Sequence, residues 1–232
     1  PHPAGVRILA AASLVDLLAT LSPLAARDGL SLVSSFGASA QVRAQVEHGA
    51  PADLLISASA DDARDLQARG LTTPSRCRAL YRNHLVLVAP VDGFVRTLDD
   101  LRTRGRVGLG DPRVVPAGRY AEASLRHCGL WSALEGRRVT GADVRVVLGW
   151  VARGEVDAAV VYDTDRRADA TRVRLVETLP DDSHPPIEYV AIIPSQAVNP
   201  DGAEAVLRFL DRDEARRAAS TLGFEPLMRG TP

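Results

Sequence analysis

Apolar residues at the start of the chain follow two different periods. Residues 6–10 form a short apolar run typical of a buried strand, and four leucines between Leu14 and Leu21 then repeat at helical spacing. Ser13, followed three residues later by Asp16, is typical of a capping box at the start of that helix. Two further strand–helix pairs are predicted before residue 71, namely 30–35 with 39–48 and 53–57 with 61–69. This repeated order predicts parallel strands joined by crossover helices.

A second series of apolar runs and helical spacings begins at His84. Its predicted strands are 84–89, 107–109, 158–162, 173–176 and 188–193, and its predicted helices follow Pro116 and span 144–153, 200–211 and 214–222. No Ser/Gly-rich linker separates the two series, so we expect two lobes joined by strands that cross between them. The prediction is an α/β protein in which residues 1–83 and 188–232 form the first lobe and residues 84–187 the second. Each lobe is expected to hold a mainly parallel sheet with flanking helices.

The composition excludes several classes of function. The chain has 232 residues, 46% of them hydrophobic, which is enough for a substantial core. Its 28 basic residues are all arginines and nearly balance 29 acidic residues, so the net charge of −1 predicts no general attraction to nucleic acid or anionic membranes. Because the chain has no lysine, a Walker A phosphate loop, a protein-kinase site and Schiff-base chemistry are excluded.

The motifs of common catalytic and metal sites are missing from the sequence. It contains no GxSxG, HExxH or CxxC motif and its five histidines are scattered, so we predict no catalytic residue and no site for a bare metal cation. Asp163 and Asp165 follow a predicted strand, where they serve either as loop or cap residues or, in an enzyme, as acid–base groups. Cys77 and Cys128 are either separate thiols or, in an oxidising compartment, a disulfide; the sequence leaves this open.

Polar groups recur where predicted strands give way to predicted helices. Ser13 and Ser39 stand at such positions in the first lobe, and Tyr162 ends a strand in the second. The second lobe also offers helix starts at Pro116-Ala117-Gly118 and at Asp143-Val144. Ligands of α/β proteins gather at the carboxyl ends of strands, and helix N-termini suit anions because their N–H groups are unpaired and carry partial positive charge. The recurrence in both lobes predicts an anion site in a cleft that takes donors from each lobe.

The order of several short motifs resembles one known family. The motifs are AAASL (10–14), SSFGAS (34–39), GAPADLLISA (49–58), GDP (110–112), VPAG (115–118), DVR (143–145), VVY (160–162), PDDSH (180–184) and GF (223–224). Together they resemble the molybdate-binding periplasmic proteins that supply ATP-driven importers. The resemblance runs through nearly the whole chain, and the joint order of the motifs is more specific than any one of them.

This resemblance implies a fold, a ligand and a site. The fold is a two-lobed periplasmic binding protein of type II, and the ligand is molybdate, with tungstate as a second ligand. The side chains of Ser13, Ser39 and Tyr162 and the backbone N–H groups of Ser13, Ser39, Ala117 and Val144 would hold the oxyanion. The partner is the membrane permease of an ABC importer; no cofactor and no nucleic acid are implied. We expect an exported, periplasmic or extracytoplasmic monomer whose leader is absent from this chain.

The physical chemistry of a doubly charged oxyanion agrees with such a donor set. Molybdate carries no proton at neutral pH, so every contact must donate a hydrogen bond, and hydroxyls with helix N-termini can do so without arginine. We therefore expect Arg43, Arg119 and Arg145, which lie near the predicted site, to point to solvent.

Three alternatives stay open at this point. A receptor for sulfate or phosphate would need the same kinds of donor. An enzyme on the same scaffold would use Asp163 or Asp165 as its acid–base group. A ligand-sensing module of a regulator is disfavoured because the sequence has no DNA-binding segment and no basic patch.

Overall fold

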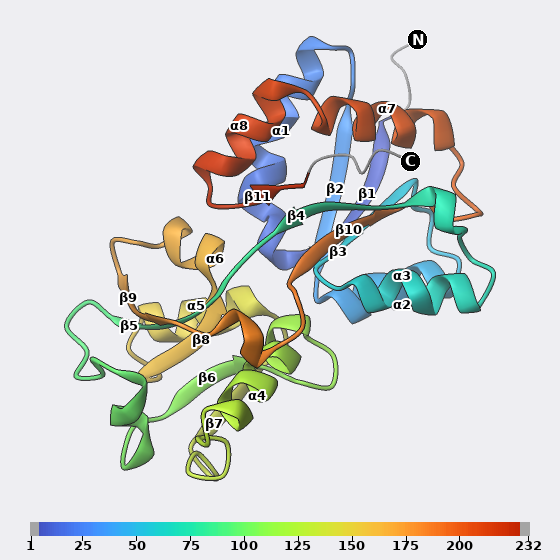
Figure 1. Cartoon of the computed structure of the whole chain (residues 1–232). Helices are drawn as coiled ribbons and strands as arrows, with labels where there is room; N and C mark the ends of the chain where they lie inside the picture. The colour runs from blue at the N-terminus through green and yellow to red at the C-terminus, as the bar shows by residue number, and fades with distance from the viewer. Residues whose placement is uncertain (1–4, 228–232) are drawn as a thin grey trace. The chain divides into compact units, whose positions relative to one another are not determined.

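The chain forms two compact α/β units. The computed structural model describes residues 5–227, and within them one unit runs to Arg82 and resumes at Glu188, while the other comprises Asn83–Ile187 (Figure 1). The chain therefore passes from the first unit to the second and back again. Each unit has a sheet of its own.

The first unit is built on a six-stranded sheet in the order β11-β4-β10-β3-β1-β2. Strand β1 is parallel to β2 and β3, whereas β10 is antiparallel to β3 and β4, and β11 is antiparallel to β4. In Figure 1, α2 and α3 lie on one face of this sheet and α1, α7 and α8 on the other. Its elements are β1 (Val6–Ala11), the 3₁₀ helix η1 (Ala12–Leu14), α1 (Val15–Arg27), β2 (Leu32–Gly37), α2 (Ser39–Glu47), β3 (Leu54–Ser57), α3 (Ala60–Ala68), η2 (Pro74–Arg76), β4 (Cys77–Arg82), β10 (Glu188–Ile192), α7 (Pro200–Leu210), α8 (Asp213–Thr221) and β11 (Glu225–Pro226).

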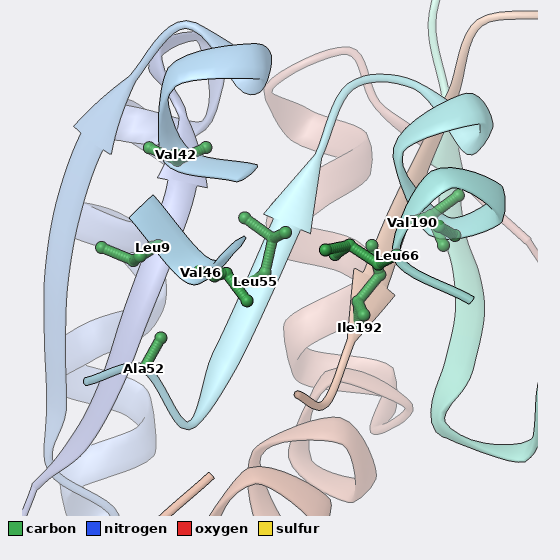
Figure 2. Close-up of a cluster of buried hydrophobic side chains, with 9 residues drawn as sticks. Leu9, Val42, Val46, Ala52, Leu55, Leu66, Val190 and Ile192 are labelled. Carbon is green, nitrogen blue, oxygen red and sulfur yellow. The ribbon is translucent and has the colours of Figure 1, made fainter. Parts of the chain in front are cut away.

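A cluster of buried aliphatic side chains joins helices α2 and α3 to the sheet (Figure 2). Val42 and Val46 stand four residues apart on α2, so both point to the same side of the helix. Leu66 contributes from α3, and the sheet contributes side chains from β1, β3 and β10. Burial of these side chains fixes the helices on the sheet and with them the position of the first turn of α2.

The second unit is built on a five-stranded sheet in the order β7-β6-β8-β5-β9. Strand β6 is parallel to β7 and β8, and β5 is antiparallel to β8 and β9. Its elements are β5 (Leu85–Pro90), η3 (Leu98–Arg102), β6 (Val107–Gly110), α4 (Pro116–His127), β7 (Arg138–Gly141), α5 (Val144–Ala152), β8 (Ala158–Tyr162), α6 (Asp163–Ala168), β9 (Val173–Thr178) and η4 (Asp181–Ser183).

The predicted α/β class is confirmed, and the structure adds elements that the apolar pattern does not reveal. Both sheets are mixed: the strands followed by helices are parallel as predicted, and the strands beside the crossings between the units are antiparallel. Strand β4 was missed because arginines interrupt its short apolar run, and α6 was missed because its sequence DTDRRA has almost no apolar residue.

Asp53 ties three parts of the first unit together. Its buried carboxylate accepts the backbone N–H of Arg7 at 2.9 Å and forms an ion pair with the Arg7 guanidinium at 3.2 Å. The same carboxylate accepts the N–H groups of Val198 and Asn199 at 3.1 and 2.9 Å. Burial alone would raise the pKa of Asp53, but the hydrogen bonds from Arg7 and Asn199 outweigh it and lower this pKa to about 2.

Asp53 should therefore make the protein sensitive to acid. The ionised form is favoured in the folded state, so its contribution is complete above the ordinary pKa of 3.8 and is lost as the pH falls toward 2. Asp53→Asn is expected to lower the free energy of unfolding at pH 7 by about 2 kcal/mol and to flatten the fall in stability between pH 4 and pH 2. The measurement is a series of denaturant titrations across this pH range, with Asp92→Asn, a change at an exposed residue, as control. If the stability of Asp53→Asn fell between pH 4 and pH 2 as steeply as that of the wild type, the role given to Asp53 would be wrong.

The first turn of α4 rests directly on the end of β6 because both contact positions are glycine. A Cβ atom at Gly118 would overlap the carbonyl oxygen of Gly110, and one at Gly110 would approach Cγ1 of Val115 to 2.5 Å. Glycine thus lets the backbone of the helix approach the backbone of the strand, and Pro116 supplies a φ angle suited to the first helical position.

Gly118→Ala should displace the first turn of α4 and destabilise the protein. Because the overlap is with backbone rather than with a flexible side chain, the neighbouring atoms cannot easily move away. We therefore expect the free energy of unfolding to fall by about 1–3 kcal/mol or more, the usual cost of overpacking. Gly149→Ala within α5 is the matched control, since its Cβ would meet only the end of the Arg153 side chain and alanine favours a helix. Equal unfolding midpoints for the two variants would refute this account of the β6–α4 packing.

Candidate functional site

The predicted serines of the first unit lie at the carboxyl edge of its parallel strands. Ala11 at the end of β1 pairs with Gly37 at the end of β2, and Ser13 and Ser39 each follow two residues later. Both side chains are buried, each with 2% exposure. The strand register therefore brings these two residues to neighbouring positions at one edge of the sheet.

Ser13 is held by a tyrosine far along the chain. Its Oγ lies 2.8 Å from Oη of Tyr189, which is near the start of β10. The predicted capping box at Asp16 is wrong: Ser13 lies inside the 3₁₀ helix η1, and the N-cap of α1 is Leu14, without a side-chain cap. The Ser13 hydroxyl is thus linked to the start of β10.

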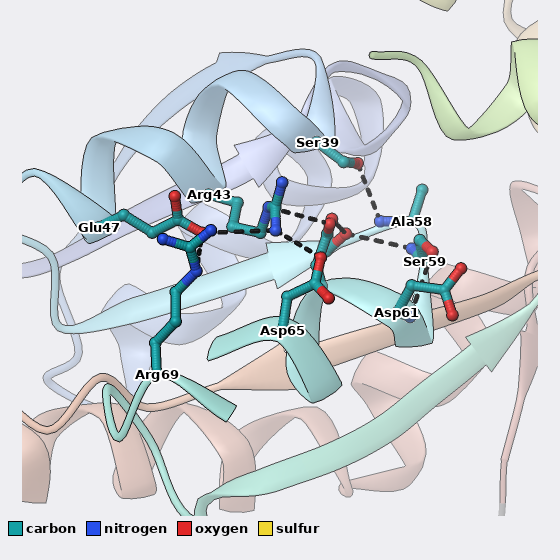
Figure 3. A network of polar contacts seen from close by, with 10 residues as sticks. Ser39, Arg43, Glu47, Ala58, Ser59, Asp61, Asp65 and Arg69 are labelled. Carbon is teal, nitrogen blue, oxygen red and sulfur yellow. Dashed lines mark hydrogen bonds and ion pairs between the residues drawn. The ribbon is translucent and has the colours of Figure 1, made fainter. Parts of the chain in front are cut away.

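Ser39 contacts the end of the next parallel strand. It is the first residue of α2, and its Oγ accepts the backbone N–H of Ala58, directly after β3, at 3.2 Å (Figure 3). Ser39 thus ties the start of α2 to the end of β3. The residue before it, Ala38, is the N-cap and donates its N–H to the side chain of Gln41 at 3.3 Å.

A buried carboxylate fixes the geometry around Ser39. Asp62, on α3, accepts a hydrogen bond from the hydroxyl of Ser57 and forms an ion pair with Nε of Arg43 at 3.3 Å. Arg43 stands one helical turn after Ser39, and Ser57 precedes Ala58, so the contacts form a closed ring through α2, β3 and α3. The Arg43 side chain is only 20% exposed and also pairs with Glu47 and Asp65, which corrects the expectation that it points to solvent.

In the second unit the predicted residues occupy the equivalent edge. Gly110 and Gly141 end β6 and β7 as a register pair, and Tyr162 ends the neighbouring parallel strand β8. Ala117 is the second residue of α4 and Val144 the first of α5, and all three predicted residues are buried. Backbone N–H groups at these helical positions have no acceptor within their own helix. They are donors directed toward the start of the helix.

A second buried carboxylate joins the starts of α5 and α6. Asp165 is fully buried, accepts the N–H of Tyr162 at 3.3 Å and forms an ion pair with Nε of Arg145 at 2.7 Å. Arg145 is the residue after Val144, and its side chain is only 22% exposed, so it too is not the solvent-facing residue that we expected. Asp143 completes the arrangement by capping α5, where it accepts the N–H of Val146 at 2.9 Å.

The two aspartates of the alternative enzyme are both held by arginines. Asp163 pairs with Arg166 at 2.6 Å and Arg167 at 2.7 Å. Burial raises the pKa of Asp163, but these two guanidinium groups lower it overall, so the carboxyl stays ionised. Asp165 is enclosed and paired with Arg145. The lowered pKa of Asp163 is the opposite of what a general acid needs at neutral pH.

Other features of residues 5–227 add no further candidate. Within this range no group of three or more His, Cys, Asp or Glu side chains is arranged to hold a metal ion. Helices long and apolar enough to cross a membrane are likewise not found there. Cys77 and Cys128 are free thiols and belong to different units.

The arrangement can bind an anion that has only acceptor atoms. In each unit, hydroxyls and helix N-termini gather at the carboxyl edge, and the nearby charges are already paired with one another. Sequence reasoning placed the predicted residues at these strand ends and helix starts but missed Tyr189, Asp62 and the pair of Arg145 with Asp165. The cap at Asp143 can be expected from the local sequence, because an aspartate before a helix commonly accepts a backbone N–H of its first turn. The contact of Tyr189 with Ser13 and the pair of Arg145 with Asp165 join separate elements and leave no local pattern.

Comparison with known proteins agrees with this geometry. The family described as bacterial extracellular solute-binding protein matches residues 6–225. The chain is 34% identical to the molybdate-binding protein ModA of Haemophilus influenzae over 230 residues, which cover 95% of this chain and 90% of that protein.

Solved structures give the same result for the fold. The substrate-binding domain of a putative molybdenum ABC transporter from Clostridium difficile superposes with a TM-score of 0.76 at 29% identity, covering 97% of this chain and 99% of that one. The periplasmic molybdate-binding protein of Azotobacter vinelandii gives 0.85 at 21% identity, with 97% and 100% covered. The resemblance predicted from the motifs is confirmed: this chain belongs to the family of bacterial extracellular solute-binding proteins.

Proposed function

We propose that this protein binds molybdate, and tungstate as a second ligand, and delivers it to the permease of an ABC importer. The observation that carries the proposal is the pair of carboxyl edges, one in each unit, at which buried neutral donors gather. The names of relatives along nearly the whole chain, a molybdate-binding protein and the substrate-binding domain of a putative molybdenum ABC transporter, support this choice of ligand and partner.

The donor set matches the chemistry of the oxyanion. The hydroxyls of Ser13, Ser39 and Tyr162 and the backbone N–H groups of Ser13, Ser39, Ala117 and Val144 would each donate a hydrogen bond. A tetrahedral dianion accepts at every oxygen, and hydrogen bonds to a charged acceptor are stronger than those between neutral groups. The N-termini of α2, α4 and α5 add the positive ends of three helix dipoles.

The proposal requires donors from both units. We propose that the units are the two lobes of the binding protein, that the ligand is held in the cleft between them, and that binding is accompanied by a hinge motion. The two crossings of the chain, near Arg82 and Glu188, are the natural place for such a hinge. We further propose a monomeric, non-enzymatic protein that works in the periplasm or outside the cytoplasmic membrane, as its family name indicates.

Two alternatives differ in their chemistry. A receptor for sulfate or phosphate would use donors of the same kind, so only a comparison of ligands can separate it from the proposal. An acid–base enzyme would need an available carboxyl group, and both Asp163 and Asp165 are ion-paired. The family disfavours a module of a cytoplasmic regulator.

Molybdate should raise the thermal stability of the protein much more than sulfate or phosphate. At a hundredfold excess over Kd, binding adds about 2.7 kcal/mol to the stability of the folded state. For a chain of this size this corresponds to a rise in Tm of about 5–11 °C. Melting curves with molybdate, tungstate, sulfate and phosphate provide the measurement. A shift with sulfate or phosphate as large as that with molybdate would contradict the assignment of the ligand.

Removal of single hydroxyls should weaken binding without abolishing the fold. Ser39→Ala and Tyr162→Phe each leave one oxygen of the ligand without its donor. We therefore expect each variant to lose about 1.5–3 kcal/mol of binding free energy, which raises Kd roughly 10- to 150-fold. Asp163→Asn is the control in calorimetric titrations, because it changes a charged group beside Tyr162 without removing a proposed donor. Loss of binding in Asp163→Asn, with normal affinity in the two hydroxyl variants, would favour the enzyme instead.

A further inference from the structure

We propose that Tyr189 is a positioning residue that aims the hydroxyl proton of Ser13 at the bound oxyanion. The inference rests on the proposed function, because it assumes that Ser13 donates to the ligand. It adds a residue from a distant part of the chain that is not itself a ligand donor.

The geometry places Tyr189 behind Ser13 within the first unit. The two hydroxyl oxygens are 2.8 Å apart, and both side chains are buried, Tyr189 with 0% exposure. Val190 pairs with Ser57 at the end of β3, so the start of antiparallel β10 lies at the carboxyl edge of the parallel strands. The Tyr189 ring packs edge-on against Phe224 with centroids 5.3 Å apart, which fixes the direction of its hydroxyl.

The direction of the hydrogen bond follows from what the ligand can accept. A serine hydroxyl has one proton and two lone pairs, and an oxyanion without protons can only accept. If Ser13 gives its proton to the ligand, its oxygen must be the acceptor in the contact with Tyr189. The Tyr189 hydroxyl is then the donor, and the pair forms a chain that runs from Tyr189 through Ser13 to the ligand.

The oxygen of Ser39 also accepts a hydrogen bond, but from a different kind of donor. Its oxygen accepts the backbone N–H of Ala58, so its own proton is directed elsewhere. In this proposal both serines at this edge are held through their oxygens, Ser39 by a main-chain N–H and Ser13 by a phenol. A hydroxyl fixed before the ligand arrives loses less rotational freedom on binding. Tyr189 would supply this preorganisation for Ser13.

The chain offers a closely matched control for this role. Tyr81 is the register partner of Tyr189 on β4, is buried with 2% exposure, and packs against the same Phe224 ring at 5.5 Å. Its hydroxyl has no hydrogen-bond partner among the described residues. Tyr81→Phe thus removes an identical group from the same aromatic cluster without touching Ser13.

The experiment is a double-mutant cycle measured by calorimetric titration with molybdate. Loss of one net hydrogen bond should weaken binding by Tyr189→Phe roughly 2- to 12-fold, whereas Tyr81→Phe should stay within about twofold of the wild type. In the Ser13→Ala background, Tyr189→Phe should cause no further loss, because the hydroxyl that it orients is gone. A merely structural role of Tyr189 would weaken binding equally in both backgrounds.

The outcomes separate this inference from the proposed function. Wild-type affinity in Tyr189→Phe, or independent losses that multiply in the double variant, would overturn the positioning role while leaving molybdate binding intact. No molybdate binding by the wild type, or unchanged affinity in Ser13→Ala, would refute the proposed site and the inference with it. Equal circular dichroism and unfolding midpoints of Tyr189→Phe and Tyr81→Phe would show that the comparison concerns binding and not folding.

Discussion

The carboxyl edge of each unit depends on a buried ion pair between neighbouring helices. In the first unit Asp62 pairs with Arg43, and in the second Asp165 pairs with Arg145. Both aspartates are the third residue of the helix that follows a strand, and each also accepts a hydrogen bond from the last residue of that strand. The same device thus joins strand end, following helix and preceding helix in two unrelated stretches of sequence.

Such a pair contributes to geometry more than to stability. Desolvation of two charges offsets most of their attraction, but removal of one partner leaves an uncompensated buried charge and costs several kcal/mol. The folded state is therefore restricted to arrangements in which the carboxylate and the guanidinium meet. Because Arg43 follows Ser39 on α2 and Arg145 follows Val144 on α5, this restriction also fixes the helix starts that carry the proposed donors.

The sequence was sufficient to predict the strand–helix pairs and the residues at their junctions, because hydrophobic periodicity and helix-start signals are local. Ser13, Ser39 and Tyr162 lie at the strand ends where that reasoning placed them. The roles of the serines could not be predicted in the same way. Ser13 contacts a residue 176 positions away, and Ser39 one that is 19 positions away, so local sequence rules could not name these partners.

The contacts of the arginines could not be predicted from the sequence either, for a physical reason. Their number predicts many ion pairs, but not which of them are buried, since this depends on which carboxylate the packing of two helices brings within reach. Arg145 stands beside a proposed donor and would be a strong anion ligand if its charge were available. Asp165 neutralises it instead, so the local charge is balanced before any ligand arrives. An oxyanion held by neutral donors and helix dipoles would leave without breaking an ion pair, which suits the proposed delivery of the ligand to a membrane permease.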